Sequence, residues 1–191
     1  MVQENKTALS KTRTLVQVAW IGLILMSTYL VIGVPVGLLN PRLIMPWLGV
    51  CFWGPGLVIG LPWESLTLAQ WRAYLLPVGL WGVVGTASVL YAVDQIRRIV
   101  LQPGSASPFT AENAGRIRKA GLAVLCSAGA KVLRDISFGH FIALNVTIPG
   151  AQVSYRSDMG LSTLFLGLMI LAVAEVMRHG VKLQEDQDLT V

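Results

Sequence analysis

Three ionisable residues interrupt an otherwise apolar stretch in the second half of the chain: Lys131, Arg134 and Asp135. A charge at the centre of a bilayer costs about 2.5 to 3.5 kcal/mol, so such groups face a protein interior, a cavity or each other. Lys131 and Asp135 are four residues apart and can pair on one helical face. Arg134 is expected to have no acidic partner in its own helix. The pattern predicts either a structural cluster, with Arg134 reaching outward, or a contact for an anion or a partner protein.

The residues that usually perform catalysis form no recognisable motif. The sequence has no metalloprotease helix motif, nucleophile elbow, phosphate loop or metal-ligand cluster. Its two histidines, His140 and His179, lie far apart, and its two cysteines, Cys51 and Cys126, are too few for a disulfide framework or a zinc site. We therefore expect a protein that is not an enzyme and that needs no metal or cofactor.

Four apolar stretches must position the charged residues. The composition is 54% hydrophobic and 13% charged, with a mean hydropathy of +0.64, which indicates an integral membrane protein. A helix needs about 20 residues to cross the hydrocarbon. The sequence predicts an all-α, single-domain membrane protein with four transmembrane helices, at about 16–39, 73–93, 122–146 and 159–177.

Basic residues alternate between the two sides of these spans. They are concentrated before the first span, in the segment 95–119 and in the tail 178–191, whereas the segments on the other side hold few. Because short loops rich in Lys and Arg remain in the cytoplasm, both termini are expected there. The anionic inner leaflet accounts for the net charge of +5, so direct nucleic-acid binding is not expected.

The segment 40–72 between the first two spans is apolar but contains several prolines and glycines. Irregular backbone cannot face lipid, so we expect this segment at the outer interface. Its aromatic residues suit the headgroup level of the bilayer: Trp47, Trp53, Trp63 and Trp71, followed by Tyr74. They form either an aromatic belt or a re-entrant cover over a cavity or partner surface.

Small residues indicate where helices approach closely within a membrane. Gly79, Gly82 and Gly85 recur every three residues in the second span, and Gly129 lies in a small-residue run of the third. We expect these two helices to pack together and run antiparallel. The same glycine face also permits a homo-oligomer.

Two polar segments carry a recognisable pattern. After Pro103, Gly104 and Pro108, Thr110 is suited to cap a helix that starts near Ala111. The segment from Pro108 to Gly121 reads PFTAENAGRIRKAG, and the C-terminal segment from Ala174 to Val191 reads AEVMRHGVKLQEDQDLTV. Together with LTLAQWRAYLLPVG, from Leu66 to Gly79, they resemble the bacterial four-helix membrane family of unknown function DUF2975.

The resemblance implies a multi-pass protein of the bacterial inner membrane that acts as the membrane partner of a small helix-turn-helix transcription regulator. The family's third span is usually uncharged, so the charged triplet at 131–135 departs from its pattern. By position, the implied cytoplasmic contacts are Phe109, Glu112, Asn113, Arg116 and Arg118 in the loop, and Glu185, Asp186, Asp188, Leu189 and Val191 in the tail.

Two functions therefore remain open, both non-catalytic and both based on protein–protein interaction. The first is this regulatory membrane partner. The second is an accessory subunit of a larger membrane complex, which Arg134 without an acidic partner, the glycine faces and the tryptophan-rich outer segment favour. A small oligomeric channel is the weaker third interpretation.

Overall fold

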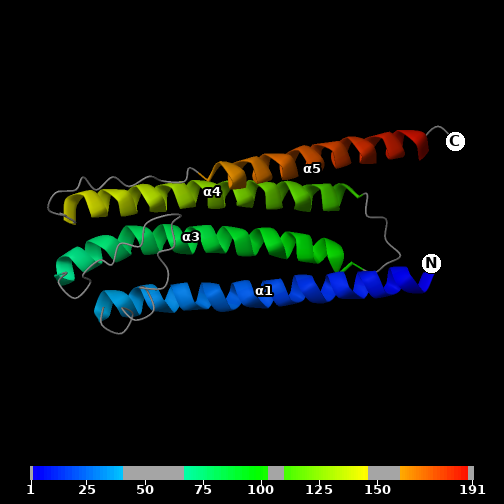
Figure 1. Cartoon of the computed structure of the whole chain (residues 1–191). Coiled ribbons are helices and arrows are strands. Elements are labelled where there is room, and N and C mark those ends of the chain that lie inside the picture. Colours follow the sequence, from blue (N-terminus) through cyan, green and yellow to red (C-terminus); the bar gives the residue numbers. More distant parts are fainter. Residues whose placement is uncertain (1, 41–66, 103–109, 146–159, 189–191) are drawn as a thin grey trace. The chain divides into compact units, whose positions relative to one another are not determined.

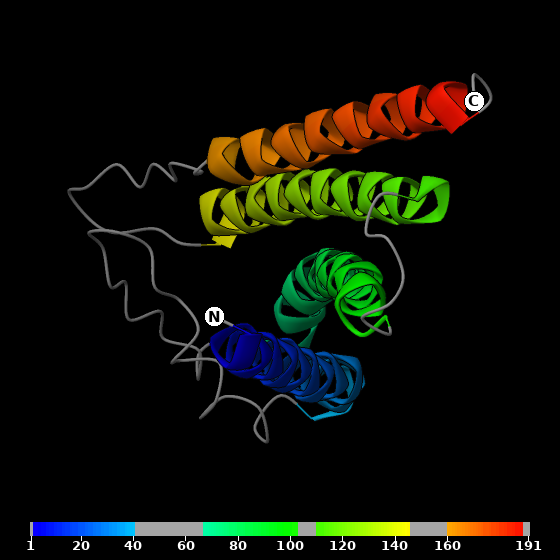
Figure 2. The same cartoon turned by 90° about the vertical axis from the view of Figure 1, so that its right-hand side faces the viewer.

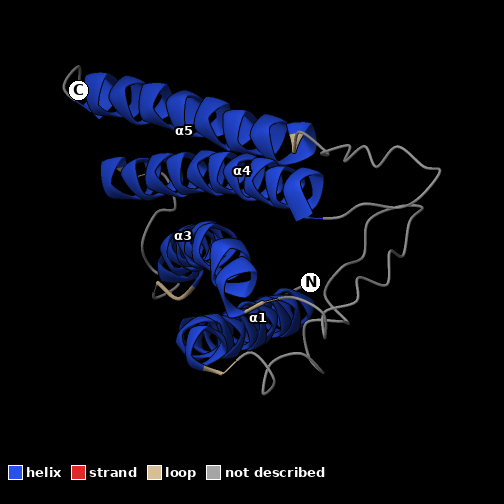
Figure 3. Cartoon of the chain, turned by 90° about the vertical axis from the view of Figure 1, so that its left-hand side faces the viewer, coloured by secondary structure: helices blue, strands red, loops and turns tan. Residues whose placement is uncertain are grey.

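The computed structural model describes residues 2–40, 67–102, 110–145 and 160–188, and within these ranges the chain forms long helices and no strand (Figures 1 and 3). The described helices are α1 (Val2–Leu39), α3 (Leu68–Val100), α4 (Ala111–Asn145) and α5 (Leu161–Asp188). Each is longer than the apolar span predicted within it. At a rise of 1.5 Å per residue, the 38-residue α1 extends about 57 Å, far beyond the hydrocarbon thickness.

Three of these helices are long and apolar enough to cross a membrane: α1 over Thr12–Leu39, α3 over Leu68–Val100 and α5 over Leu161–Gln184. They coincide with the first, second and fourth predicted spans. The 35-residue α4 is long enough, but it is not among them. Its polar start and the charged triplet at 131–135 reduce its apolar character.

The described chain divides into two compact units, and α1, α3 and α4 each contribute a part to both. Unit 1 comprises Met1–Met26, Gly85–Gly129 and Gly160–Val191, whereas unit 2 comprises Ser27–Val84 and Ala130–Met159. Unit 1 therefore holds the start of α1, the end of α3, the start of α4 and all of α5. The two units are described separately below.

The start of α3 is fixed by a capping box. The Gln70 backbone N–H donates to Thr67 Oγ1 at 3.3 Å, and the Thr67 backbone N–H donates to Gln70 Oε1 at 2.9 Å. These bonds satisfy backbone donors that a helix start leaves without intrahelical partners. The helix consequently begins at Leu68, so the end of the predicted interfacial segment 40–72 is regular helix. The rest of that segment, 41–66, lies outside the described residues.

Aromatic packing joins α3 to α4 in unit 2. Trp71 and Tyr74 are each 1% exposed and pack with Phe141, whose ring centroid lies 5.1 Å from that of Tyr74. Gln70 Nε2 donates to Asn145 Oδ1 at 3.0 Å beyond this cluster. The prediction that Trp71 and Tyr74 present half-wet rings in an aromatic belt was therefore wrong, because α4 covers them. Trp47, Trp53 and Trp63 lie outside the described residues.

Small residues bring helices together in unit 1, where α4 and α5 lie side by side (Figure 2). A Cβ added at Gly121 would lie 2.8 Å from Leu171 Cδ2, and one added at Gly167 would lie 2.7 Å from Leu125 Cδ2. Four residues further along α4, from Gly121 to Leu125, the contact on α5 lies four residues earlier, at Gly167 instead of Leu171. The two helices are therefore antiparallel here. On its other side, α4 packs Ala120 and Ala123 near Ala92 of α3.

The second and third predicted spans, α3 and α4, pack against each other in both units, as predicted. The contacts are not made by the glycines that led to this prediction. Gly79 is in contact with Val34 of α1, where an added Cβ would lie 2.8 Å from a methyl carbon. A Cβ added at Gly82 or Gly129 would meet no neighbouring atom within 4 Å, and Gly85 is half-buried on α3. Alanine and aromatic side chains, rather than the glycines, join α3 to α4.

Candidate functional site

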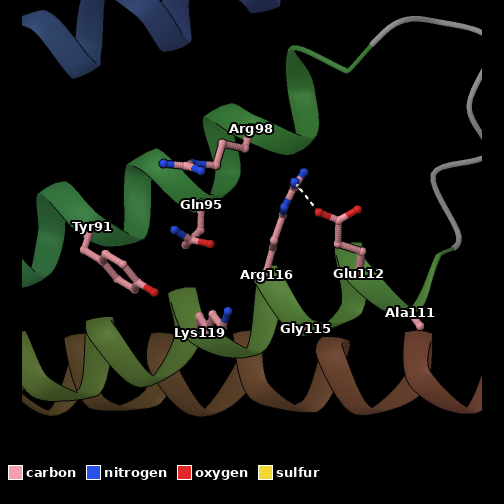
Figure 4. A pocket seen from close by; sticks show the side chains of 8 residues that line it. All are labelled: Tyr91, Gln95, Arg98, Ala111, Glu112, Gly115, Arg116 and Lys119. Carbon is pink, nitrogen blue, oxygen red and sulfur yellow. Dashed lines mark hydrogen bonds and ion pairs between the residues drawn. The ribbon is translucent and has the colours of Figure 1, made fainter.

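The polar residues of unit 1 line an open cleft between the end of α3 and the start of α4 (Figure 4). Its volume is about 490 Å³. Polar and charged side chains line both sides: Tyr91, Gln95 and Arg98 from α3, and Glu112, Arg116 and Lys119 from α4. In Figure 4, Tyr91 and Gln95 point from α3 toward α4, and Arg116 points from α4 toward α3.

Helix capping sets the position of the α4 side of the cleft. The helix begins at Ala111, as predicted, and the Asn113 backbone N–H donates to Thr110 Oγ1 at 3.2 Å. One turn further on, Arg116 Nη2 lies 2.5 Å from Glu112 Oε1. A carboxylate in the first turn is favourable at the positive end of a helix, and here it also orients the guanidinium.

A hydrogen-bond network connects the start of α4 to the end of α3, and the end of α3 to α1. Asn113 is fully buried, and its Nδ2 donates to Gln102 Oε1 at 2.9 Å. Gln102 follows the end of α3, and its carbonyl accepts a hydrogen bond from Arg13 of α1 at 3.2 Å. Asn113, which the family resemblance implied as a partner contact, instead links α4 to the end of α3.

On the α3 side of the cleft, the carboxylate of Asp94 positions two arginine side chains. It lies 2.7 Å from Arg98 Nε and 3.5 Å from Arg97 Nη2. Arg97 also stacks over the ring of Trp20 in α1, with its guanidinium carbon 4.1 Å from the ring centroid, a cation–π contact. Arg98 extends along the cleft, while Arg97 connects α3 to α1.

The remaining cytoplasmic contacts implied by the resemblance are dispersed. Arg118 is exposed on α4 and does not line the cleft, and Asp186 is exposed on α5. Glu185 and Asp188 lie in the last turns of α5. Phe109, Leu189 and Val191 lie outside the described residues.

The charged triplet Lys131, Arg134 and Asp135 forms a second polar cluster, in unit 2. Lys131 Nζ lies 3.4 Å from Asp135 Oδ2, which confirms the predicted pair. Arg134 Nη2 lies 3.3 Å from Asp135 Oδ1, so the expectation that Arg134 has no acid in its own helix was wrong. The carboxylate side chain is 10% exposed, compared with 31% for Lys131 and 43% for Arg134.

A metal centre finds no support in the part of the chain that the structure describes. It contains no group of three His, Cys, Asp or Glu side chains placed to hold an ion. His179 Nδ1 lies 2.9 Å from the Glu175 carbonyl oxygen, and His140 is exposed on α4. Glu175 also pairs with Arg178, three residues further along α5.

The α3 wall of the cleft was not predicted from the sequence. Tyr91, Gln95 and Arg98 are spaced by four and three residues, which places them on one helical face. This spacing was the available signal.

Comparison with known proteins supports the resemblance to the DUF2975 family that the sequence showed. The model of the family described as protein of unknown function (DUF2975) matches residues 64–191, which include α3, α4 and α5. This α-helical chain with membrane-spanning character therefore belongs to the DUF2975 family. No curated protein and no solved structure matches it.

Proposed function

We propose that this protein is a non-catalytic, multi-pass protein of the bacterial inner membrane that acts by binding another protein at its cytoplasmic side. In this proposal all four helices cross the bilayer and both termini are cytoplasmic. The distribution of basic residues supports this orientation. The contacts of Asp135 with Lys131 and Arg134 support a crossing by α4, because they reduce the cost of placing these charges in lipid.

The observation that carries the interaction role is the polar end of unit 1. Helix α5 continues to Asp188, beyond the apolar stretch that ends at Gln184. Near this end of α5, Leu183 is 65% exposed and is flanked in the sequence by Lys182 and Gln184. The start of α4 adds the exposed side chains of Glu112 and Arg118. Helical polar surface outside the membrane is well suited to recognising a protein.

The proposed partner is a small helix-turn-helix transcription regulator, as the family resemblance implies. The chain ends in the acidic sequence QEDQDLTV. A DNA-binding protein carries a basic surface that such a tail can attract electrostatically. Binding would hold the regulator at the membrane without any chemical reaction.

The alternative is an accessory subunit of a larger membrane complex, and one observation favours it. The side chain of Arg134 remains 43% exposed on an otherwise apolar part of α4, although it contacts Asp135. A partly exposed guanidinium in this position can reach a carboxylate of a neighbouring subunit.

Purification in mild detergent from the native membrane, followed by mass spectrometry of bound proteins, tests both proposals. The variant Glu185→Lys/Asp186→Lys/Asp188→Lys reverses the charge of the tail, and Glu185→Asp/Asp186→Glu/Asp188→Glu is the matched control that keeps it. We expect a helix-turn-helix protein to remain bound to the wild type and the control, and to be lost from the charge-reversed variant.

Two other results would overturn the regulatory proposal. Integral membrane subunits that bind stoichiometrically and do not respond to the tail charge would establish the accessory role instead. A protein that purifies alone in all three forms would contradict both functions.

A further inference from the structure

The cleft between α3 and α4 contains a buried amide that the fold does not use. Gln95 is 7% exposed, and its side chain makes no hydrogen bond within the described ranges. In Figure 4 it points from α3 into the cleft, between Tyr91 and Arg98. The residue is largely covered, and its amide group lies on the lining of the cleft without a partner among the described residues, so this group is available to a ligand.

The charges around this amide favour an anion. The described lining includes three cationic side chains, Arg98, Arg116 and Lys119, and one carboxylate, Glu112. Arg98 directs its Nε to Asp94 and Arg116 directs an Nη to Glu112, which leaves other guanidinium N–H groups available. Lys119 contacts no carboxylate in the part of the chain described here. The positive end of the α4 dipole lies at the same cleft.

The types of donor favour phosphate over a carboxylate. Two guanidinium groups, an ammonium, an amide and a phenol approach from two helices, and a phosphate offers oxygens in several directions to receive them. The cleft, at about 490 Å³ and open to solvent, also has room for a group attached to the phosphate.

We propose that the cleft lined by Gln95, Arg98, Arg116 and Lys119 binds a phosphate group, carried either by a membrane phospholipid or by a small soluble phosphate. A bound phosphate would connect the end of α3 to the start of α4. The site lies within unit 1 alone and requires no protein partner, so it stands independently of the function proposed above.

Binding to the full-length protein in detergent tests this proposal, with two kinds of probe. Native mass spectrometry with phosphatidylglycerol, compared with phosphatidylcholine, reports on a lipid phosphate. Calorimetry with inorganic phosphate and glycerol phosphate reports on a soluble one. Selective retention of phosphatidylglycerol identifies the lipid source, and binding of either soluble probe identifies the other. No binding of any probe overturns the proposal.

Matched variants locate the site. Arg116→Gln and Arg118→Gln each remove one guanidinium from the same turn of α4, but only Arg116 lines the cleft. We expect Arg116→Gln to weaken binding about tenfold or more, because it removes charge-assisted hydrogen bonds, and Arg118→Gln to change it little. Equal losses in both variants would show attraction by the general surface charge and would contradict a defined site.

Gln95→Leu is a second, uncharged test that does not disturb the ion pairs of the cleft. It keeps the net charge, so a loss of affinity here cannot come from long-range attraction. We expect weaker binding with an unchanged thermal midpoint of the ligand-free protein. Unchanged affinity in Gln95→Leu would show that this amide does not contact the phosphate. Unchanged affinity in both Gln95→Leu and Arg116→Gln would refute the proposal.

Discussion

Asp135 makes ion-pair contacts with two cations. Its two carboxylate oxygens lie 3.4 Å from Lys131 Nζ and 3.3 Å from Arg134 Nη2. One buried carboxylate therefore neutralises charges that would otherwise be costly in an apolar helix. Lys131 and Arg134 share this one carboxylate, so losing Asp135 leaves two cations without it, whereas losing either cation leaves one ion pair in place.

Replacing Asp135 by Asn should therefore destabilise the protein more than replacing Lys131 by Met. We expect a loss of about 2 kcal/mol for Asp135→Asn, less than for a fully buried pair because Arg134 is partly exposed. In Lys131→Met, Arg134 keeps its carboxylate and the loss should be smaller. Thermal unfolding of both variants in the same detergent measures the difference. Equal midpoints would show that the shared carboxylate is not the centre of this cluster.

Residue spacing predicted some of these contacts and missed others for a geometric reason. Pairs three or four residues apart lie on one helical face, so Lys131 with Asp135 and Asp94 with Arg98 could be predicted. Arg134 and Asp135 are adjacent, and neighbouring residues leave a helix in different directions. Only the length of the arginine side chain lets them meet, which a periodicity argument does not consider.

Apolar length and capping chemistry predicted most of the elements. The three clearest apolar stretches correspond to α1, α3 and α5, and Thr110 marked the start of α4. The start of α3 was missed although Thr67 and Gln70 have capping-box spacing. Burial of Trp71 could not be predicted, because a tryptophan near a membrane border fits an interfacial belt and a helix–helix contact equally well.

Close packing of α4 on α5 depends on Gly167. An added Cβ there would lie 2.7 Å from Leu125 Cδ2 and 3.2 Å from the Leu125 backbone nitrogen, which cannot rotate away. We expect Gly167→Ala to lower stability by about 1 to 3 kcal/mol through overpacking. Gly129→Ala is the control, because open space surrounds that position on α4. Thermal midpoints in detergent compare the two, and a midpoint for Gly167→Ala as high as the control would contradict this contact.

At the scale of the whole molecule, the sequence pointed to residues on one wall of the cleft as partner contacts, but it did not predict the cleft itself. The family-like segment from Pro108 to Gly121 contains Glu112 and Arg116, which line it. The opposite wall comes from α3, and its contribution depends on how α3 faces α4. That orientation follows from the packing of Ala92, Ala120 and Ala123, three small residues that a hydrophobicity pattern does not distinguish.

The number of crossings can be decided by α4, because the charged triplet makes it the least apolar of the four helices. If α4 crosses, the segments on either side of it are on opposite faces of the membrane, and the N- and C-terminal ends are on the same face. With three crossings, the two ends are on opposite faces. The contacts of Lys131 and Arg134 with Asp135 favour a crossing, since paired charges cost less in lipid than separate ones.

Labelling single cysteines in intact cells with a membrane-impermeant maleimide measures this directly. In a background carrying Cys51→Ser and Cys126→Ser, Ser105→Cys and Ser157→Cys test the two sides of α4, and Gln184→Cys tests the C-terminal end. We expect Ser157→Cys to react in intact cells, and the other two only after permeabilisation, because loops rich in Lys and Arg generally stay in the cytoplasm. Reaction of Ser105→Cys and Ser157→Cys under the same condition would place both on one side, and α4 would then be a helix that does not span the bilayer.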